Sequence, residues 1–343
     1  MTKIFLTGAS GYIGGEVIHQ LAEALPNHRI RALVRDATKT EAIATVSGQI
    51  EIVPGTLDDV ETIAGESAAA DVVLHLAATG HLASTRAIYD GLAKVATAKQ
   101  PRHWIQISGA SALAAAEIAD TSRVPGSPSD TIHDDLSGAE NIRDIIHSHP
   151  SRAVDNLVLG VEQKSPGIKT ALVFGPVIYG EGSGPVNKRS IQVPSLAKAT
   201  LKRRRGLQIG SGLSRWGNIH IGDLGRMIIQ LVKAASASPS DGALWGHNGL
   251  YLAGVGEIAF GDISKQVAAA ARTMGLCDDD EVEEVYGAEA DALLPHGNVL
   301  FGTNARGRPL RAEHLLGWVA TGEPLEKEIP RAAAAEAKAL GLQ

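Results

Sequence analysis

A glycine-rich segment near the N-terminus has the residues and spacing of a phosphate-binding loop. Residues 7–15 read TGASGYIGG, directly after a short apolar run and directly before apolar residues at helical spacing. Such glycines permit a tight turn from strand to helix, close approach of backbone N–H groups to a pyrophosphate, and close packing of the helix on the sheet. The N-terminus of the helix then faces the phosphates with the positive end of its dipole. We therefore predict a dinucleotide site, with an unliganded glycine turn as the alternative, at Gly8, Ser10, Gly11, Tyr12, Ile13 and Gly14.

The end of the second apolar run bears on which dinucleotide is bound. The run is followed by Arg35 and then by Asp36. A carboxylate at this place holds the ribose 2′-hydroxyl of NAD, whereas an arginine suits the 2′-phosphate of NADP. Because Arg35 comes first, we predict NADP as the cofactor and NAD as the less favoured one. An ordinary surface role for Arg35 is the alternative.

The elements that must position these residues follow from the hydrophobic pattern. Apolar runs of strand length alternate with segments in which apolar residues recur at helical spacing, such as Val17, Ile18 and Leu21. The runs are continuous, which is typical of parallel strands covered on both faces. They occupy residues 4–6, 30–34, 50–53, 72–76, 104–107 and 171–174. The sequence therefore predicts an α/β protein with a Rossmann-type, doubly wound parallel sheet.

The pattern of apolar residues changes after Gly180. Residues 180–185 read GEGSGP, and the elements expected after them are short and separated by glycine and proline. We expect residues 1–180 to form the dinucleotide-binding domain, with a contribution from 219–236 that includes a helix over 227–232. Residues 181–218 and 237–343 are then a small C-terminal substrate-binding region. Helical spacing runs from Ile258 to Met274, and the alanine-rich tail over 332–339 is predicted to be a terminal helix.

Composition excludes several classes of protein. The chain has 343 residues, 44% hydrophobic and 20% charged, which excludes wholesale disorder. A net charge of −6 and only 4% aromatic residues do not indicate binding to nucleic acid or to an anionic membrane. The single cysteine, Cys277, and the lack of a long apolar run favour a cytoplasmic location. We expect a small-molecule substrate as partner, no nucleic acid and no membrane, and a homodimer as the candidate assembly.

Several motifs, in this order along the chain, resemble those of the extended short-chain dehydrogenase/reductase family, which includes NAD-dependent epimerases and dehydratases. Besides the glycine spacing they are Asp58 after the third run, LAA at 76–78, ISGAS at 107–111, GPVIYG at 175–180 and IHIGDL at 219–224. The resemblance covers roughly residues 1–230. It implies adenine contacts from Leu57 and Asp58, ribose contacts from Ala77 and Ala78, active-site hydroxyls at Ser108 and Ser111, and nicotinamide contacts from Pro176 and Val177.

The chain departs from that family at the reacting end. The family's reductases use a Tyr-x-x-x-Lys pair, in which the lysine lowers the pKa of the tyrosine and the tyrosine passes the proton. No such pair occurs in this sequence; Arg152 falls where the lysine would be and Ser148 where the tyrosine would be. The protein is therefore expected to be an atypical member.

Other polar residues expected near the nicotinamide are therefore the candidate catalytic residues: Ser108, Ser111, Tyr179, His149 and Arg152. Packing is the alternative for Tyr179, surface exposure for His149, and simple completion of the strand end for the two serines. His147 and His149 alternate instead of lying four residues apart on one helix face, so we expect no metal site.

The substrate region offers fewer signals. Residues 185–194 are positioned to line a substrate pocket, where Lys188 and Arg189 would contact an anionic or carbonyl group or would simply be solvated. Trp216 and Asn218 are candidates for an apolar wall. We expect an NADP(H)-dependent oxidoreductase that reduces a carbonyl or related group of a small metabolite. The alternatives are a non-catalytic, redox-sensing NADP binder and a non-redox isomerase or cyclase.

Overall fold

The computed structural model describes residues 2–237 and 239–342. Residues 1, 238 and 343, which belong to the domain ranges predicted above, lie outside the described residues. Its centre is a seven-stranded sheet in the order β11-β7-β5-β4-β1-β2-β3, in which every pair of neighbours is parallel. The predicted Rossmann-type α/β fold is confirmed. The strands are β1 (Lys3–Thr7), β2 (Arg29–Val34), β3 (Ile50–Pro54), β4 (Val72–His75), β5 (Arg102–Gly109), β7 (Ile168–Gly175) and β11 (Leu250–Leu252).

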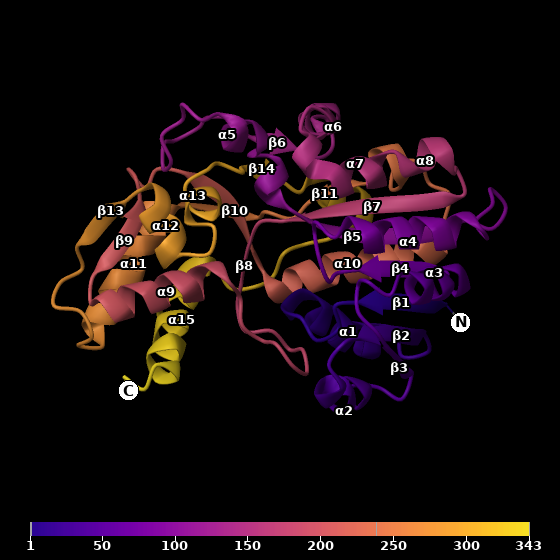
Figure 1. Cartoon of the computed structure of the whole chain (residues 1–343), viewed down its shortest axis with the longest axis horizontal. Helices are drawn as coiled ribbons and strands as arrows, with labels where there is room; N and C mark the ends of the chain where they lie inside the picture. The colour runs from indigo at the N-terminus through magenta and orange to yellow at the C-terminus, as the bar shows by residue number, and fades with distance from the viewer. Residues whose placement is uncertain (1, 238, 343) are drawn as a thin grey trace.

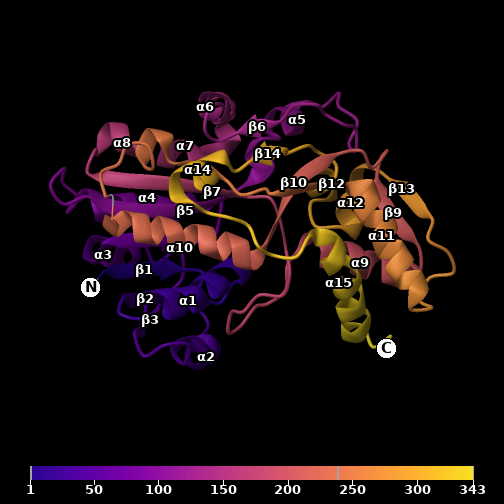
Figure 2. The same ribbon diagram turned by 180° about the vertical axis from the view of Figure 1, so that it is seen from behind.

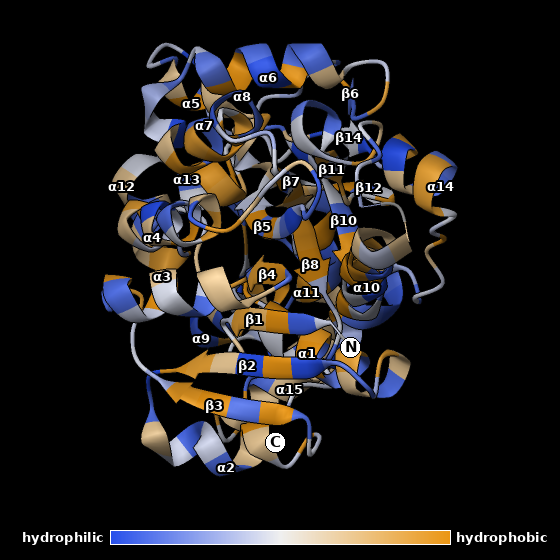
Figure 3. Ribbon diagram, turned by 90° about the vertical axis from the view of Figure 1, so that its right-hand side faces the viewer, coloured by the Kyte–Doolittle hydropathy of each residue, from blue (hydrophilic) through white to orange (hydrophobic). Residues whose placement is uncertain are grey.

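The six apolar runs predicted as strands all lie in this sheet, and they are apolar on both sides for the expected reason. Along β1, Phe5 points into one hydrophobic core while Ile4 and Leu6 point into another. Helices α1 (Tyr12–Ala24) and α10 (Ile221–Ala237) cover the second core, and α3 (Val60–Ala69), α4 (Leu82–Ala93) and α7 (Ala153–Leu159) cover the first (Figures 1 and 2). Figure 3 shows the apolar strands enclosed between these layers.

Three local expectations needed correction. The apolar spacing from Val154 to Val161 belongs to two helices, α7 and α8 (Val161–Lys164), because the chain breaks at Gly160. The segment from Ile258 to Met274 starts as the end of strand β12 (Gly256–Ala259) before helix α11 (Phe260–Thr273) begins. Strand β11 was not predicted, since its three residues give too short an apolar run to distinguish from a loop.

Beside the sheet lies a second group of elements, at the left of Figure 1. Helices α9 (Gln192–Arg203), α11 and α15 (Leu325–Ala339) pack on one another there, next to the paired strands β9 (Gly206–Ile209) and β13 (Val282–Val285). The predicted division into two regions stays a prediction. Strand β11 and helix α14 (Leu310–Leu316) come from residues 237–343, which were predicted for the substrate-binding region, but they pack with the large sheet.

Short elements complete the chain. Strands β8 (Val177–Tyr179), β10 (Arg215–His220) and β12 form a small sheet, and β6 (His133–Asp134) pairs with β14 (Gly307–Arg308). Among residues 2–237 and 239–342, none of the helices is long and apolar enough to cross a membrane. The remaining elements are η1 (Ala37–Lys39), α2 (Thr40–Ala44), η2 (Ala110–Ala112), α5 (Ala115–Ala119), α6 (Ala139–His147), η3 (Pro150–Arg152), η4 (Gly246–Asn248), α12 (Gly287–Leu293) and α13 (Gly297–Leu300).

Candidate active site

The strand order indicates a ligand-binding crevice at the carboxyl ends of the central strands. It reverses direction between β1 and β4, and in open α/β sheets ligands bind outside the carboxyl ends of the strands at such a point. Two cavities open there, of about 420 and 490 Å³. Gly11, Leu76 and Ala77 line both cavities, so the two form adjoining parts of one site.

The glycine loop forms the floor of the first cavity. Gly8 has a φ of +92°, a conformation that side chains rarely adopt, and its O accepts a hydrogen bond from Gly11 N at 2.8 Å. A Cβ on Gly8 would come within 2.8 Å of Ala77 N, and one on Gly14 within 2.2 Å of Gly8 O. Gly14 therefore serves the packing of α1 and does not line either cavity, whereas Ser10 and Gly11 line the first.

The start of α1 suits an anion. Its N-cap, Gly11, offers no side-chain cap, and its first turn holds no acidic residue. The first N–H groups of a helix have no partner within the helix, and the dipole adds positive charge there. The chemistry of this loop therefore fits the pyrophosphate of a dinucleotide.

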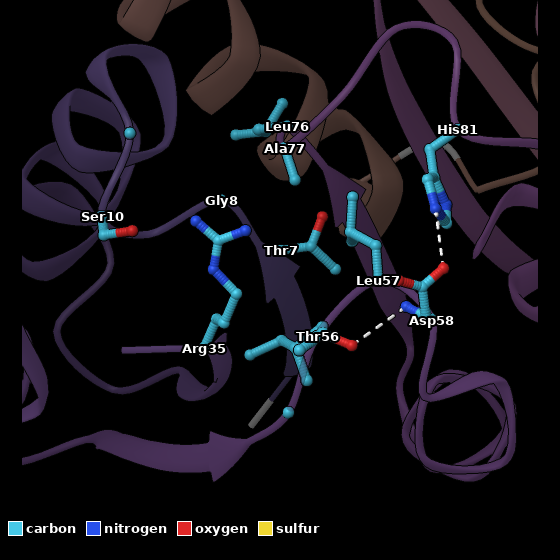
Figure 4. A pocket seen from close by; sticks show the side chains of 13 residues that line it. Thr7, Gly8, Ser10, Arg35, Thr56, Leu57, Asp58, Leu76, Ala77 and His81 are labelled. Atoms are coloured by element: carbon cyan, nitrogen blue, oxygen red, sulfur yellow. Dashed lines mark hydrogen bonds and ion pairs between the residues drawn. The ribbon is translucent and has the colours of Figure 1, made fainter. Parts of the chain in front are cut away.

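The two charged residues after β2 differ in what they face. Arg35 lines the first cavity, and Figure 4 shows its guanidinium extended toward the glycine loop. The Asp36 carboxylate instead accepts hydrogen bonds from Thr38 N at 3.0 Å and Thr38 Oγ1 at 2.6 Å, and it pairs with Lys39 at 3.2 Å. These donors lower the pKa of Asp36, with the Thr38 hydroxyl as the main cause. The arginine is thus directed to the cavity and the carboxylate to its own turn.

The predicted adenine-side residues lie together across the cavity from Arg35. Leu57, Asp58 and Ala77 line it, and Asp58 Oδ1 lies 3.2 Å from Nε2 of His81, another lining residue (Figure 4). Sequence reasoning missed His81. The available signal was its position three residues after the LAA segment, just before the predicted helix that is α4.

A buried chain of polar groups runs behind His81. His81 Nδ1 lies 3.0 Å from Ser84 Oγ, which in turn lies 3.1 Å from His75 Nε2. His75 Nδ1 lies 2.6 Å from Oγ1 of Thr7, at the end of β1. Burial lowers the pKa of His75 to about 4, so this imidazole is neutral near pH 7 and fixes the ends of β1 and β4 by hydrogen bonding alone.

The second cavity continues toward the ends of β5 and β7. Its lining includes Tyr12 and Ile13 of the predicted dinucleotide loop, the predicted ribose contacts Ala77 and Ala78, the predicted active-site serines Ser108 and Ser111, and Pro176, a predicted nicotinamide contact. Trp216, predicted as an apolar wall, also lines it, together with Ile191, Gln192 and Leu300. Val177, the neighbour of Pro176, is buried in β8 and is not among the described lining residues.

One wall of this cavity carries a charged hydrogen-bond cluster. Ser108 Oγ donates to Asp155 Oδ1 at 2.8 Å and accepts from Arg152 Nη2 at 2.9 Å. Arg152 also donates to Asp155 Oδ2 from Nε at 2.6 Å and to Ser111 Oγ from Nη1 at 3.3 Å. The structure thus brings together three predicted residues, Ser108, Ser111 and Arg152, around an aspartate that was not predicted.

Asp155 is almost fully buried, with 1% of its side chain exposed. Burial raises its pKa, while Arg152 and Ser108 act in the opposite direction. Asp155 lies three residues after Arg152, one helical turn along the chain. That Arg-x-x-Asp spacing was the sequence signal for the cluster, and it is a weak one because most such pairs lie on exposed helix faces.

Comparisons with known proteins agree with this geometry. Residues 8–133 match a family model described as NAD(P)H-binding. The protein named oxidase ucsJ from Acremonium sp is 33% identical over 99% of both chains. The structure of dTDP-glucose 4,6-dehydratase from Bacillus anthracis, in complex with NAD, matches 98% of this chain and 97% of its own at a TM-score of 0.66, with 14% identity. UDP-glucuronic acid 4-epimerase from Bacillus cereus matches 98% and 99% at 0.64, also with 14% identity.

The chain belongs to the extended short-chain dehydrogenase/reductase family. It therefore carries an NAD(P)H-binding domain of an oxidoreductase-like family. The two positions predicted to correspond to the family's tyrosine and lysine do not lie on one helix in this chain. Helix α6 ends at His147, the exposed Ser148 follows it, and Arg152 comes from the separate turn η3.

The structure does not bring the other two catalytic candidates to the cavity. His149 Nδ1 lies 2.6 Å from Ile145 O, within its own turn. Tyr179 is buried, donates its hydroxyl to Glu323 O at 2.8 Å and packs edge-on against His220. Burial raises the pKa of Tyr179 to about 12. Neither residue is among those described as lining the two cavities, so the packing alternative describes Tyr179 better.

Proposed function

We propose that the protein is an NADP(H)-dependent oxidoreductase that acts at an oxygen-bearing carbon of a small organic substrate. The observation that carries the proposal is the pair of adjoining cavities: one has the glycine loop and Arg35, and the other ends at the Ser108–Arg152–Asp155 cluster. The name of the full-length relative, an oxidase, supports redox chemistry over a structural role.

The choice of NADP rests on how β2 ends. A 2′-phosphate in the first cavity would meet the Arg35 guanidinium, whose planar donors suit phosphate oxygens. The carboxylate that would hold a 2′-hydroxyl, Asp36, is bonded to Thr38 and Lys39. The N–H groups at the start of α1 would hold the pyrophosphate, and Leu57, Asp58 and Ala77 would contact the adenosine.

The bound cofactor supplies or accepts the hydride with its electron pair, and the chain must handle the proton of the substrate oxygen. The Arg152 guanidinium has only N–H donors, which it directs to the Ser108 and Ser111 hydroxyls, so it positions these oxygens and offers no acceptor for the proton. The Ser108 hydroxyl uses its hydrogen for Asp155 and one lone pair for Arg152. Its remaining lone pair can accept a hydrogen bond from a substrate hydroxyl.

Proton removal follows from that arrangement. As Ser108 Oγ takes the substrate proton, its own proton passes to Asp155 Oδ1, 2.8 Å away. Because burial raises the pKa of Asp155, this carboxylate is a stronger base than an exposed one. The reverse movement returns the proton to a substrate oxygen during reduction. In this proposal Ser108 and Asp155 take over the proton transfer of the missing tyrosine, Ser111 orients the substrate oxygen, and Arg152 holds the two serine hydroxyls in place.

Cofactor turnover tests the proposal. NADPH oxidation is measured with a panel of ketones and aldehydes, and NADP+ reduction with the matching alcohols. We expect turnover with part of the panel, a loss of at least about a hundredfold in Ser108→Ala and Asp155→Asn, and little change in Ser122→Ala, an exposed serine outside both cavities.

Two results would overturn this function. Tight binding of NADP+ and NADPH without turnover of any panel member would favour a redox-sensing regulator. Conversion of a substrate without net change in cofactor would favour an isomerase or cyclase. Turnover unaffected by Ser108→Ala would leave the oxidoreductase in place but remove the proposed proton path.

A further inference from the structure

The charge of the residues that line the second cavity bears on the class of substrate. We propose that the substrate is an uncharged, mainly apolar molecule with a single reacting hydroxyl or carbonyl oxygen, and not a nucleotide diphosphate sugar. This inference rests on the proposed function and names the substrate class for the same site. The solved structures with UDP-glucose or UDP-glucuronic acid share the fold at about 14–16% identity.

The described lining of the second cavity contains no Asp, Glu, Lys, Arg or His side chain. The adjoining first cavity does contain charged or titratable side chains: Arg35, Asp58 and His81. A diphosphate carries negative charge that must be matched by cations or several aimed N–H groups when it leaves water. In the second cavity, Arg152 lies behind Ser108 and Ser111 and already neutralises Asp155.

Two arginines in the neighbouring segments are held in ion pairs. Arg189 Nε lies 2.6 Å from Glu336 Oε1, so the side chain predicted to contact an anion is held by a carboxylate. Arg123 Nη2 lies 3.0 Å from Glu117 Oε2. Lys188, next to the lining residue Asn187, is an exposed side chain on a loop and supplies a single charge.

Two acidic residues, Glu16 and Glu328, lie near Tyr12, which lines the second cavity. Glu16 is buried, with 3% exposed, and its Oε2 accepts from Ser183 N at 2.6 Å. Burial, followed by Glu328 and Glu16, raises the pKa of the Tyr12 hydroxyl, which donates to Gly180 O at 2.6 Å. These acidic side chains add no cation to the cavity beyond the N–H groups at the start of α1, which the proposed function assigns to the pyrophosphate of the cofactor.

The walls that remain are apolar or carry neutral amides. Ile191, at the N-cap of α9, is 60% exposed although it is a large aliphatic residue that lines the cavity. Trp216 directs its Nε1–H away to Thr303 O at 2.9 Å, which leaves its ring as apolar surface. Gln192 donates from Nε2 to Leu300 O at 2.9 Å. Apolar walls with a few uncharged polar groups are typical of sites for small neutral ligands.

Size points to the same class. The cavity of about 490 Å³ must hold the nicotinamide end of the cofactor as well as the substrate. Drug-sized ligands occupy pockets of roughly 300–1,000 Å³. The space left beside a nicotinamide therefore favours a compact substrate whose one polar oxygen faces Ser108 and whose remainder contacts Ile191, Trp216 and Leu300.

Binding to the protein saturated with NADP+ tests the inference without knowledge of the natural substrate. Calorimetric titrations compare cyclohexanol, 1-phenylethanol and 1-octanol with UDP-glucose and dTDP-glucose at two salt concentrations. We expect at least one neutral alcohol to bind at least tenfold more tightly than either nucleotide sugar, with an affinity that salt does not change.

Two variants sharpen the result. Ile191→Glu adds a charge at an exposed position, so the fold should survive, and we expect at least fivefold weaker binding of the neutral alcohol with unchanged binding of NADP+. Ile191→Met, which keeps an apolar side chain, is its matched control. We expect Lys188→Ala to leave all alcohol affinities unchanged.

Tighter binding of a nucleotide sugar than of any alcohol, or no alcohol binding to protein that binds NADP+, overturns the substrate class. A nucleotide-sugar affinity that falls with Lys188→Ala would do so as well. These outcomes leave hydride transfer standing. Failure to bind NADP(H), or the absence of turnover with both neutral compounds and nucleotide sugars, would instead overturn the proposed function.

Discussion

Replacement of Arg35 by alanine is expected to weaken NADP+ binding selectively. The guanidinium lines the first cavity and is extended toward the glycine loop, while the neighbouring carboxylate is bonded to its own turn (Figure 4). A hydrogen bond to a charged group contributes about 1.5–3 kcal/mol. Because Arg35 is exposed, water screens the interaction and we take about 1.5–2 kcal/mol. That corresponds to a Kd for NADP+ about 10–30-fold higher.

The assay is calorimetric titration of the wild type and the variant with NADP+ and NAD+, at low and at high salt. The Kd for NAD+, which has no 2′-phosphate, should change less than about twofold, and the effect on NADP+ should shrink at high salt. Lys39→Ala is the matched control: it removes the same charge from the same turn, where Lys39 pairs with Asp36 at 3.2 Å and does not line the cavity. An Arg35→Ala variant that binds NADP+ as tightly as the wild type, or weakens NAD+ equally, would refute the reasoning.

Three further predictions concern stability. Gly8→Ala should lower the free energy of unfolding in urea by at least about 1–2 kcal/mol, because Gly8 has a φ of +92° and backbone atoms 2.8 Å from a new Cβ. Burial lowers the pKa of His75 to about 4 from 6.5, so the unfolded chain binds its proton first as the pH falls. The free energy of unfolding should therefore drop between pH 6.5 and 4, by roughly 3 kcal/mol from this residue, and His75→Asn should flatten the decline. Arg152→Met should cost about 3–5 kcal/mol by leaving Asp155 buried and unpaired, and Arg152→Met combined with Asp155→Leu should recover part of it.

Each of these has its own control. Gly65→Ala, in the exposed middle of α3 with no atom within 4 Å of the new Cβ, should raise stability by about 1 kcal/mol. Equal losses at Gly8 and Gly65 would mean that backbone conformation is not the cause. A pH profile that His75→Asn leaves unchanged would assign the decline to other groups, such as His103, whose pKa burial also lowers to about 4. Additive losses in the double variant at 152 and 155 would argue against the buried pair.

The sequence determined six of the seven strands of the large sheet and the position of the glycine loop. Strands that are apolar on both faces are typical of a parallel sheet covered by helices on both sides. Glycines at this spacing are needed because neighbouring backbone atoms leave no room for a Cβ atom. For that reason six strands and the positions of Gly8, Gly11 and Arg35 could be read from local pattern alone.

Tertiary structure decided the reacting end and the substrate side. Asp155 and His81 are ordinary polar residues in the sequence, and only the fold brings Asp155 to Ser108 and His81 to Asp58. Tyr179 and His149 looked suitable by type, but backbone carbonyls hold them away from the cavity. Whether a charge lines a cavity depends on partners distant in sequence, as with Arg189 and Glu336, 147 residues apart. Such long-range pairings leave no local pattern, so only the folded chain reveals them.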